Sequence, residues 1–193
     1  SEKAKAIIDF VDEVVKADSN DVDSLVKAFN GCYGAFIVTN FWEYMNAETE
    51  MKQLRNLKEA VKKAGLEHVV ISTLEDTRGI ISNAENKDTW VFPKGNDTMY
   101  VPHFDGKGEV AQECIDEGLP ATYLYTTFYM ENFIYTLGPS RQSDKDPYAI
   151  TIPMGDSKLS MVAVADIGKM ACAILQDPKL IGKKIGVESE SLT

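Results

Sequence analysis

The sequence is poor in the residue types that build metal sites and disulfide frameworks. It has two histidines and three cysteines, and the cysteines, Cys32, Cys114 and Cys172, lie far apart without a CxxC or CxxH spacing. This pattern excludes a histidine-rich metal site and gives no sign of a zinc site. We therefore expect no metal ligands, and a reduced intracellular, cytoplasmic location fits the cysteine pattern best.

Positive charge is also scarce. The chain has 20 Lys and Arg against 30 Asp and Glu, so its formal net charge is −10. Nucleic-acid affinity depends largely on neutralisation of phosphates by Lys and Arg, so we expect no direct nucleic-acid binding. A small anionic ligand remains compatible with this charge, because one local basic group or a helix N-terminus can bind it.

Long apolar runs are missing as well. No stretch approaches the roughly 18 apolar residues of a membrane-spanning helix, so we expect no membrane span. The first residues, SEKAKAIIDF, have no apolar core of a secretory signal. The length of 193 residues and the 44% hydrophobic content are ordinary for one globular domain, which we expect to cover residues 1–193.

The apolar residues that are present alternate between a helical and a strand pattern. The spacing predicts helices at 21–29, 47–64, 104–117, 131–137 and 166–175, and strands at 35–39, 68–73, 121–127, 148–153 and 183–187. The polar stretch between 74 and 102 is expected to be irregular. Strands that alternate with helices in this way are typical of a parallel α/β sheet.

Small polar and aromatic residues follow several of the predicted strands. They are Asp18, Thr39, Asn40, Ser72, Thr73, Thr127, Phe128 and Tyr129. In a parallel sheet, ligands bind outside the carboxyl ends of the strands, so these positions are candidates for contacts to a ligand with hydroxyl and phosphate groups. The same residue types also favour helix caps and turns, and the pattern alone leaves both interpretations open.

The segment PHFDGKGEV, residues 102–110, combines a histidine and a lysine with two glycines in a predicted helix. His103 and Lys107 share one helical face, which suits either a proton-handling or ribose-binding pair or simply a turn histidine and a solvated lysine. Each glycine costs about 1 kcal/mol relative to alanine inside a helix. Gly106 and Gly108 would allow a ligand or another part of the chain to approach closely, and the sequence does not separate these two uses.

Five segments in the same order resemble the NmrA-like family of atypical short-chain dehydrogenases/reductases. They are GCYGAFIVTNFWEY, HVVISTLEDTR, PHFDGKGEV, FYMENF and YAITIPMGD, and the resemblance extends over nearly all of the chain. It implies a Rossmann fold that binds NADP(H). Members of this family divide between reductases and redox-sensing regulators with little or no catalysis.

The resemblance also implies roles for particular residues. The wider superfamily uses a Tyr-x-x-x-Lys pair, and the matching spacing here is His103-x-x-x-Lys107, which makes both residues the candidate catalytic pair, with Lys107 holding the ribose. The cofactor contacts that we expect are Asp18, Thr39, Asn40, Phe41, Ser72, Thr73, Lys107, Tyr129 and Asn132. A neighbouring ammonium favours neutral imidazole, which makes His103 a weak replacement for the tyrosine as an acid.

One feature of the family is missing from the sequence. Members begin with a strand, a G-x-x-G-x-x-G turn and a helix that bind the pyrophosphate, whereas the first glycine here is Gly31. We therefore expect a Rossmann-like parallel sheet flanked by helices, without the first βα unit and with a small C-terminal substrate-side region. Whether the chain is a fragment, a part of a longer protein or a variant without phosphate binding stays open.

The favoured hypothesis is an NADP(H)-binding redox sensor or regulator with weak or no reductase activity. One alternative is a non-catalytic structural or assembly subunit that has kept the fold. Another is an NADPH-dependent quinone or carbonyl reductase. The expected partner is a dinucleotide, and a protein partner or a homodimer is left open.

Overall fold

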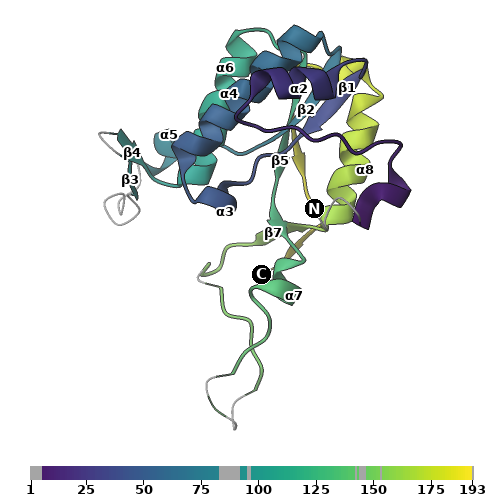
Figure 1. Ribbon diagram of the computed structural model, residues 1–193. Coiled ribbons are helices and arrows are strands. Elements are labelled where there is room, and N and C mark those ends of the chain that lie inside the picture. The colour runs from purple at the N-terminus through teal and green to yellow at the C-terminus, as the bar shows by residue number, and fades with distance from the viewer. Residues whose placement is uncertain are drawn as a thin grey trace.

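A parallel sheet forms the centre of the protein (Figure 1). The computed structural model describes residues 6–82, 92–94, 97–141, 143, 147–152 and 154–192. The sheet has four strands in the order β1 (Gly34–Ile37), β2 (His68–Thr73), β5 (Ala121–Thr126) and β8 (Lys184–Val187). All neighbouring pairs are parallel, which confirms the predicted pairing of the first three strands and the Rossmann-like fold.

The central strands are apolar because helices cover both of their faces. Every residue of β2 is buried, and so are the first four of β5. A strand buried on both faces carries a continuous apolar run instead of an alternating pattern. The outer strand β1 is more open, and its Phe36 is exposed.

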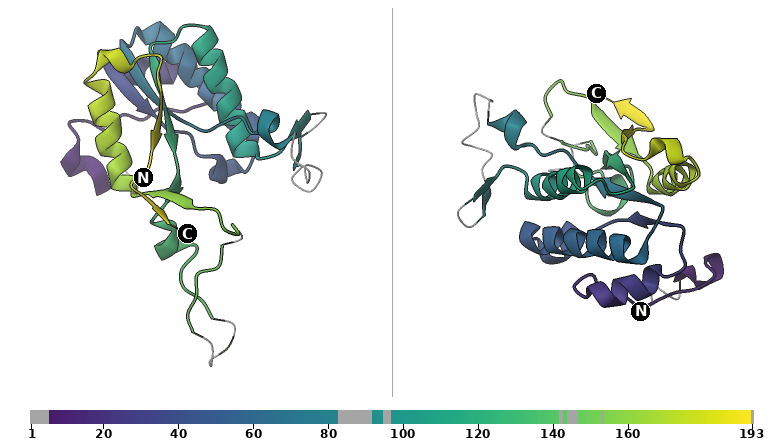
Figure 2. Two further views of the ribbon diagram at one scale, coloured as in Figure 1. Left: turned by 180° about the vertical axis from the view of Figure 1, so that it is seen from behind. Right: turned by 90° about the horizontal axis from the view of Figure 1, so that it is seen from above.

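Helices form a layer on each side of the sheet (Figure 2). The α-helices are α2 (Val22–Phe29), α3 (Phe41–Tyr44), α4 (Ala47–Ala64), α5 (Arg78–Ile81), α6 (Pro102–Asp116), α7 (Asn132–Tyr135) and α8 (Val164–Leu175), and the short 3-10 helices are η1 (Ile8–Phe10) and η3 (Pro178–Leu180). Helices α4 and α6 lie side by side on one face, α2 packs on the outer side of α4, and α8 covers the other face.

The limits of α4 follow from its terminal residues. Asn46 caps its start, because the side chain accepts a hydrogen bond from the backbone N–H of Thr49. Gly65 ends it in the left-handed conformation, with φ of 68°. The prediction of a helix over 47–64 is therefore confirmed.

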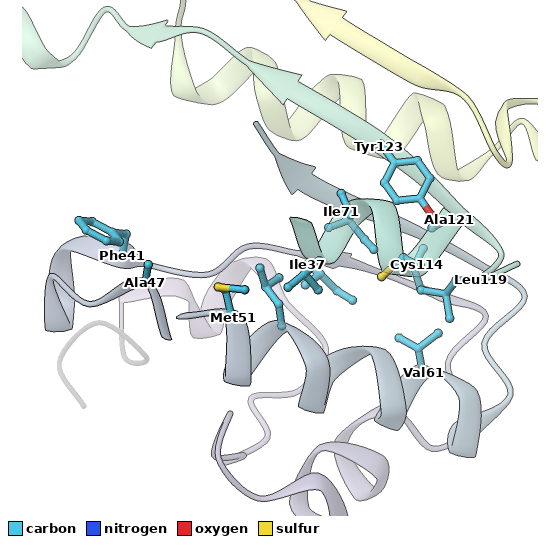
Figure 3. Close-up of a cluster of buried hydrophobic side chains, with 14 of the residues drawn as sticks. Ile37, Phe41, Ala47, Met51, Val61, Ile71, Cys114, Leu119, Ala121 and Tyr123 are labelled. Atoms are coloured by element: carbon cyan, nitrogen blue, oxygen red, sulfur yellow. The ribbon is translucent and has the colours of Figure 1, made fainter. Parts of the chain in front are cut away.

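Two apolar clusters hold these layers together. The larger cluster lies between the sheet and the helices α4 and α6, where Val61, Ile71 and Cys114 come from three different elements (Figure 3). The smaller one joins the opposite face to α8, with Leu124 from the sheet and Ile174 from the helix. Burial of apolar surface on both faces is what makes the central sheet stable.

A second, smaller sheet is formed by strands that lie before and after β8 in the chain. It consists of β6 (Phe128–Tyr129), β7 (Leu159–Val162) and β9 (Glu190–Leu192), with β6 parallel and β9 antiparallel to β7. A separate hairpin of β3 (Phe92–Lys94) and β4 (Asp97–Met99), together with α5, lies in the stretch that was expected to be irregular. These short elements gave no periodic signal in the sequence.

The predicted strand at 148–153 is wrong for its described part. Between 148 and 152 the chain makes only one isolated bridge, from Ala149 to Ser140, and residue 153 lies outside the described residues. The strand of this region is β7, which has partners on both sides. The apolar alternation of YAITI favours a strand locally, but most of its side chains are exposed and it has no ladder to join.

Candidate functional site

Lys107 lies where helix α6 meets the carboxyl ends of two strands. Its ammonium donates to the backbone carbonyl of Thr39, just after β1, at an Nζ–O distance of 3.3 Å. Its own backbone carbonyl accepts a hydrogen bond of 3.2 Å from the hydroxyl of Thr73, the last residue of β2. Both ends of the residue are therefore attached to the ligand-binding edge of the sheet.

The carboxylate of Glu50, from α4, completes this cluster. Its Oε1 accepts a hydrogen bond of 2.8 Å from the Thr39 hydroxyl and lies 3.4 Å from the ammonium nitrogen of Lys107. Glu50 is 2% exposed, and its other oxygen, Oε2, has no hydrogen-bond partner among the described residues. Three elements that are separate in sequence thus contribute one buried ion pair and its hydrogen bonds.

This environment excludes one interpretation of Lys107. The residue is 9% exposed, so the alternative of a solvated surface lysine is wrong. Among the described residues, the ammonium donates to the Thr39 carbonyl and forms an ion pair with the Glu50 carboxylate.

His103, one turn earlier on α6, lies among aromatic rings. Its ring centroid is 5.3 Å from that of Phe41, 5.1 Å from that of Trp42 and 4.9 Å from that of Phe104. Burial lowers the pKa of His103, and the charge of Lys107 lowers it further, against a smaller opposite effect of Asp105. The imidazole is therefore neutral at pH 7, as the sequence led us to expect, with burial as the larger cause.

The two glycines beside Lys107 allow close packing within the protein. A Cβ atom on Gly108 would lie 2.4 Å from the backbone nitrogen of Asp76, in the segment after β2. A Cβ on Gly106 would meet the Met51 side chain of α4 at 3.1 Å. Of the two uses that the sequence left open, close approach by another part of the chain is the one that the structure shows.

Asp105 is a buried carboxylate that sequence analysis did not single out. It is fully buried at the start of α6 and accepts hydrogen bonds from the backbone N–H and hydroxyl of Thr77, at 2.7 and 2.6 Å. Its second oxygen accepts from the backbone N–H groups of Tyr100 and Val101, at 2.8 and 3.1 Å. Asp105 thus connects two segments to the first turn of α6: the one after β2, at Thr77, and the one just before the helix, at Tyr100 and Val101.

The other residues predicted around the first two strands have mixed surroundings. Ser72 and Phe41 are buried, and Phe41 belongs to the larger apolar cluster. Asn40 is exposed and precedes α3 without a side-chain capping bond. Asp18 is exposed as well, and its carboxylate accepts hydrogen bonds from the backbone and side chain of Asn20, which lower its pKa. For Asp18 the structure shows a turn residue.

Tyr129 and Asn132 lie with the second sheet. Tyr129 is in β6 and packs against the smaller apolar cluster, and Asn132 begins α7. Among the described residues, no hydrogen bond or ion pair joins either of them to Lys107.

The residues that the structure describes contain no group of three or more His, Cys, Asp or Glu side chains that could hold a metal ion. They also contain no helix long and apolar enough to cross a membrane.

The position of Glu50 did carry a signal in the sequence. The buried side of α4 includes Ala47, Met51 and Leu54, and Glu50 falls on this same face, three residues after the first and four before the last. Its place in the first turn offers a simpler local reason for an acid, because negative charge is favourable at a helix start. An acid on the apolar face of a helix indicates a buried partner of opposite charge.

A parallel sheet between helical layers, with a polar cluster at its carboxyl edge, places the protein in the Rossmann-like class of α/β folds. The model of the NmrA-like family matches residues 1–193. The chain belongs to the NmrA-like family.

Two curated relatives illustrate the range of this family. An NmrA-like family domain-containing oxidoreductase, malD, from Malbranchea aurantiaca is 28% identical over 187 residues, which is 92% of this chain and 53% of that protein. The nitrogen metabolite repression protein nmr of Neurospora crassa is 30% identical over 180 residues, or 89% of this chain and 33% of that protein. The chain therefore spans about half or less of the length of these relatives.

Solved structures share the fold. The negative transcriptional regulator NmrA in complex with NAD matches with a TM-score of 0.66 and 24% identity, over 90% of this chain and 50% of that one. Its complex with NADP has a TM-score of 0.63. The Citrobacter sp. triphenylmethane reductase with NADP(H) matches with a TM-score of 0.69 and 18% identity, over 100% of this chain and 59% of that one.

Proposed function

We propose that this chain is an NADP(H)-binding NmrA-like protein that acts as a redox sensor or regulator, with weak or no reductase activity. The observation that carries the proposal is the position of the Lys107 ammonium at the carboxyl edge of the sheet, where it contacts the Thr39 carbonyl and the Glu50 carboxylate. Relatives and solved neighbours support it, since they include a regulator, an oxidoreductase and proteins in complex with NAD or NADP.

The residues around Lys107 fit a ribose. A ribose hydroxyl can accept a hydrogen bond from an ammonium, and a charged donor makes such a hydrogen bond strong. Thr39 and Thr73 contact Lys107, and together with Asn40, Phe41 and Ser72 they remain our proposed cofactor contacts. The corresponding roles of Asp18, Tyr129 and Asn132 stay predictions.

The surroundings of His103 favour a sensor over an enzyme. Reduction of a carbonyl or quinone by hydride leaves an oxyanion that needs a proton donor nearby. His103 has a lowered pKa and is held among aromatic rings, so it has little proton to donate at pH 7. The residue can bind and orient a ligand ring but is a poor acid.

Calorimetric titration with NADPH tests the proposal. Lys107→Ala should weaken binding by roughly tenfold or more, because a charge-assisted hydrogen bond is lost. Lys52→Ala, which removes an exposed lysine of α4, is the matched control and should leave affinity unchanged. Equal affinity of Lys107→Ala and the unchanged chain would contradict the role of Lys107, and no NADPH binding at all would favour the structural or assembly subunit.

A further inference from the structure

The buried carboxylate of Glu50 requires a positive partner. Transfer of a charged carboxylate out of water is costly unless it is paired and hydrogen-bonded. Glu50 is 2% exposed, and it lies on the face of α4 that packs against the sheet. Replacement of a buried ion pair by apolar residues is often neutral or stabilising, so the presence of Glu50 on this face points to a cause outside α4.

The contacts of Glu50 identify that cause. Thr39 donates one neutral hydrogen bond to Oε1, and Lys107 is the one cation within salt-bridge distance among the described residues. Oε2 is buried and accepts no hydrogen bond from these residues. The charge of Glu50 is therefore balanced almost entirely by Lys107.

The same contacts fix where the ammonium lies. A lysine side chain has a flexible stem, and without partners its head group would occupy several positions. Here the Thr39 carbonyl and Glu50 Oε1 hold the nitrogen from two elements, at 3.3 and 3.4 Å, while the Thr73 hydroxyl fixes the backbone of Lys107. The ammonium is thereby held at the carboxyl edge of β1.

We propose that Glu50 is the positioning residue of the site: it holds the Lys107 ammonium at the carboxyl edge of β1 and supplies its counter-charge. The consequence for the ligand rests on the proposed function, since it is the ribose hydroxyl that the positioned ammonium would bind. The ion pair between Glu50 and Lys107 does not depend on the proposed function, and it is tested separately without a ligand.

Thermal unfolding of the 193-residue chain tests the pair without any ligand. Glu50→Gln should lower Tm by about 10 °C in the otherwise unchanged protein, because it leaves the Lys107 charge unpaired. In a Lys107→Met background the same change should raise Tm, because it removes the unpaired carboxylate. Glu48→Gln, an exposed acid in the first turn of α4, is the control and should change Tm little in either background.

The test depends on whether Glu50→Gln lowers or raises Tm in each background. If Glu50→Gln lowers Tm in both backgrounds, Glu50 has a merely structural role and the proposal is overturned. If the Glu50→Gln single variant does not fold, the Tm of Lys107→Met can still be compared with that of the double variant Glu50→Gln/Lys107→Met. A double variant no more stable than Lys107→Met would equally overturn the proposal.

Calorimetry with NADPH tests the positioning. Glu50→Gln should raise the Kd about tenfold in the presence of Lys107 and have no effect in the Lys107→Met background. An unchanged Kd for Glu50→Gln, in a chain that binds NADPH, would overturn the positioning role. If the chain binds no NADPH, the proposed function is contradicted. The effect of Glu50→Gln on Tm, with Lys107 and with Lys107→Met, would still test the ion pair.

Discussion

Gly108 shows how a single residue can be required by its neighbours in the fold and not by a ligand. A Cβ atom there would come within 2.4 Å of a backbone nitrogen and 2.9 Å of the Cα of Asp76. Backbone atoms cannot move aside as a flexible side chain can. The cost of a glycine in the middle of α6 is therefore accepted so that the segment after β2 can lie against the helix.

Gly108→Ala should accordingly lower the free energy of unfolding by about 1–3 kcal/mol, since overpacking outweighs the gain in helix propensity. Gly106→Ala is the matched variant on the same helix. Its Cβ would meet the flexible Met51 side chain at 3.1 Å, so we expect little change or a gain of up to about 1 kcal/mol. Denaturant unfolding of both variants measures the difference, and equal stability of the two would contradict this account.

At the scale of elements, charged side chains connect α4 to α6. Arg55 pairs with Glu109 and Glu113, Lys58 with Glu113 and Glu117, and Lys62 with Glu117. Hydrogen bonding to Arg55 is the main cause that lowers the pKa of Glu113, and Lys58 adds to it. The pairs lie at the edge of the helix layer and fix how the two helices that carry Glu50 and Lys107 lie side by side.

Glu113→Gln should therefore lower stability by about 0.5–1 kcal/mol at pH 7, the scale of partly exposed ion pairs. Because the folded-state pKa of Glu113 is lowered, this contribution is present above the ordinary glutamate pKa of about 4.3 and is lost as pH falls through the folded value. The variant and the unchanged protein should thus converge in acid, as followed by urea unfolding from pH 7 downward. Glu67→Gln, which removes an exposed acid before β2, is the control, and a difference that persists in acid would argue against the ion pairs.

At the scale of the whole molecule, the fold determines which chemistry the site can perform. It brings Lys107 to the strand ends and surrounds His103 with Phe41, Trp42 and Phe104. Lys107 is thereby suited to binding, whereas the histidine is kept neutral. The second sheet, which we had expected as a small substrate-side region, is joined to the main sheet through the chain between β5 and β6.

We therefore expect the protein to oxidise NADPH slowly or not at all with common quinones and aldehydes. His103→Tyr should raise whatever turnover exists, because a lysine beside a tyrosine lowers a pKa that begins near 10, and the phenol can donate a proton at neutral pH. Steady-state absorbance of NADPH measures both. Turnover at ordinary enzyme rates of about 10 per second that is abolished by His103→Ala would instead identify a reductase.

The sequence by itself determined the central strands, the long helices and the family. Continuous apolar runs such as HVVIST and capped periodic segments such as 47–64 carry their signal locally, and five motifs in order identified the NmrA-like pattern. It also placed Thr39 and Thr73 at one edge, because parallel strands end together, whereas Lys107 entered only through the family resemblance.

Only the tertiary structure decided which partner each polar or small residue has. Glu50 and Asp105 look like ordinary helix acids until the fold brings Lys107 to one and Thr77 to the other. The strand at Leu159–Val162 likewise depends on neighbours from distant segments, which the more strand-like 148–152 lacks. Local patterns record the conformation that a segment favours, whereas ion pairs, close approaches and edge strands are set by groups far away in the chain.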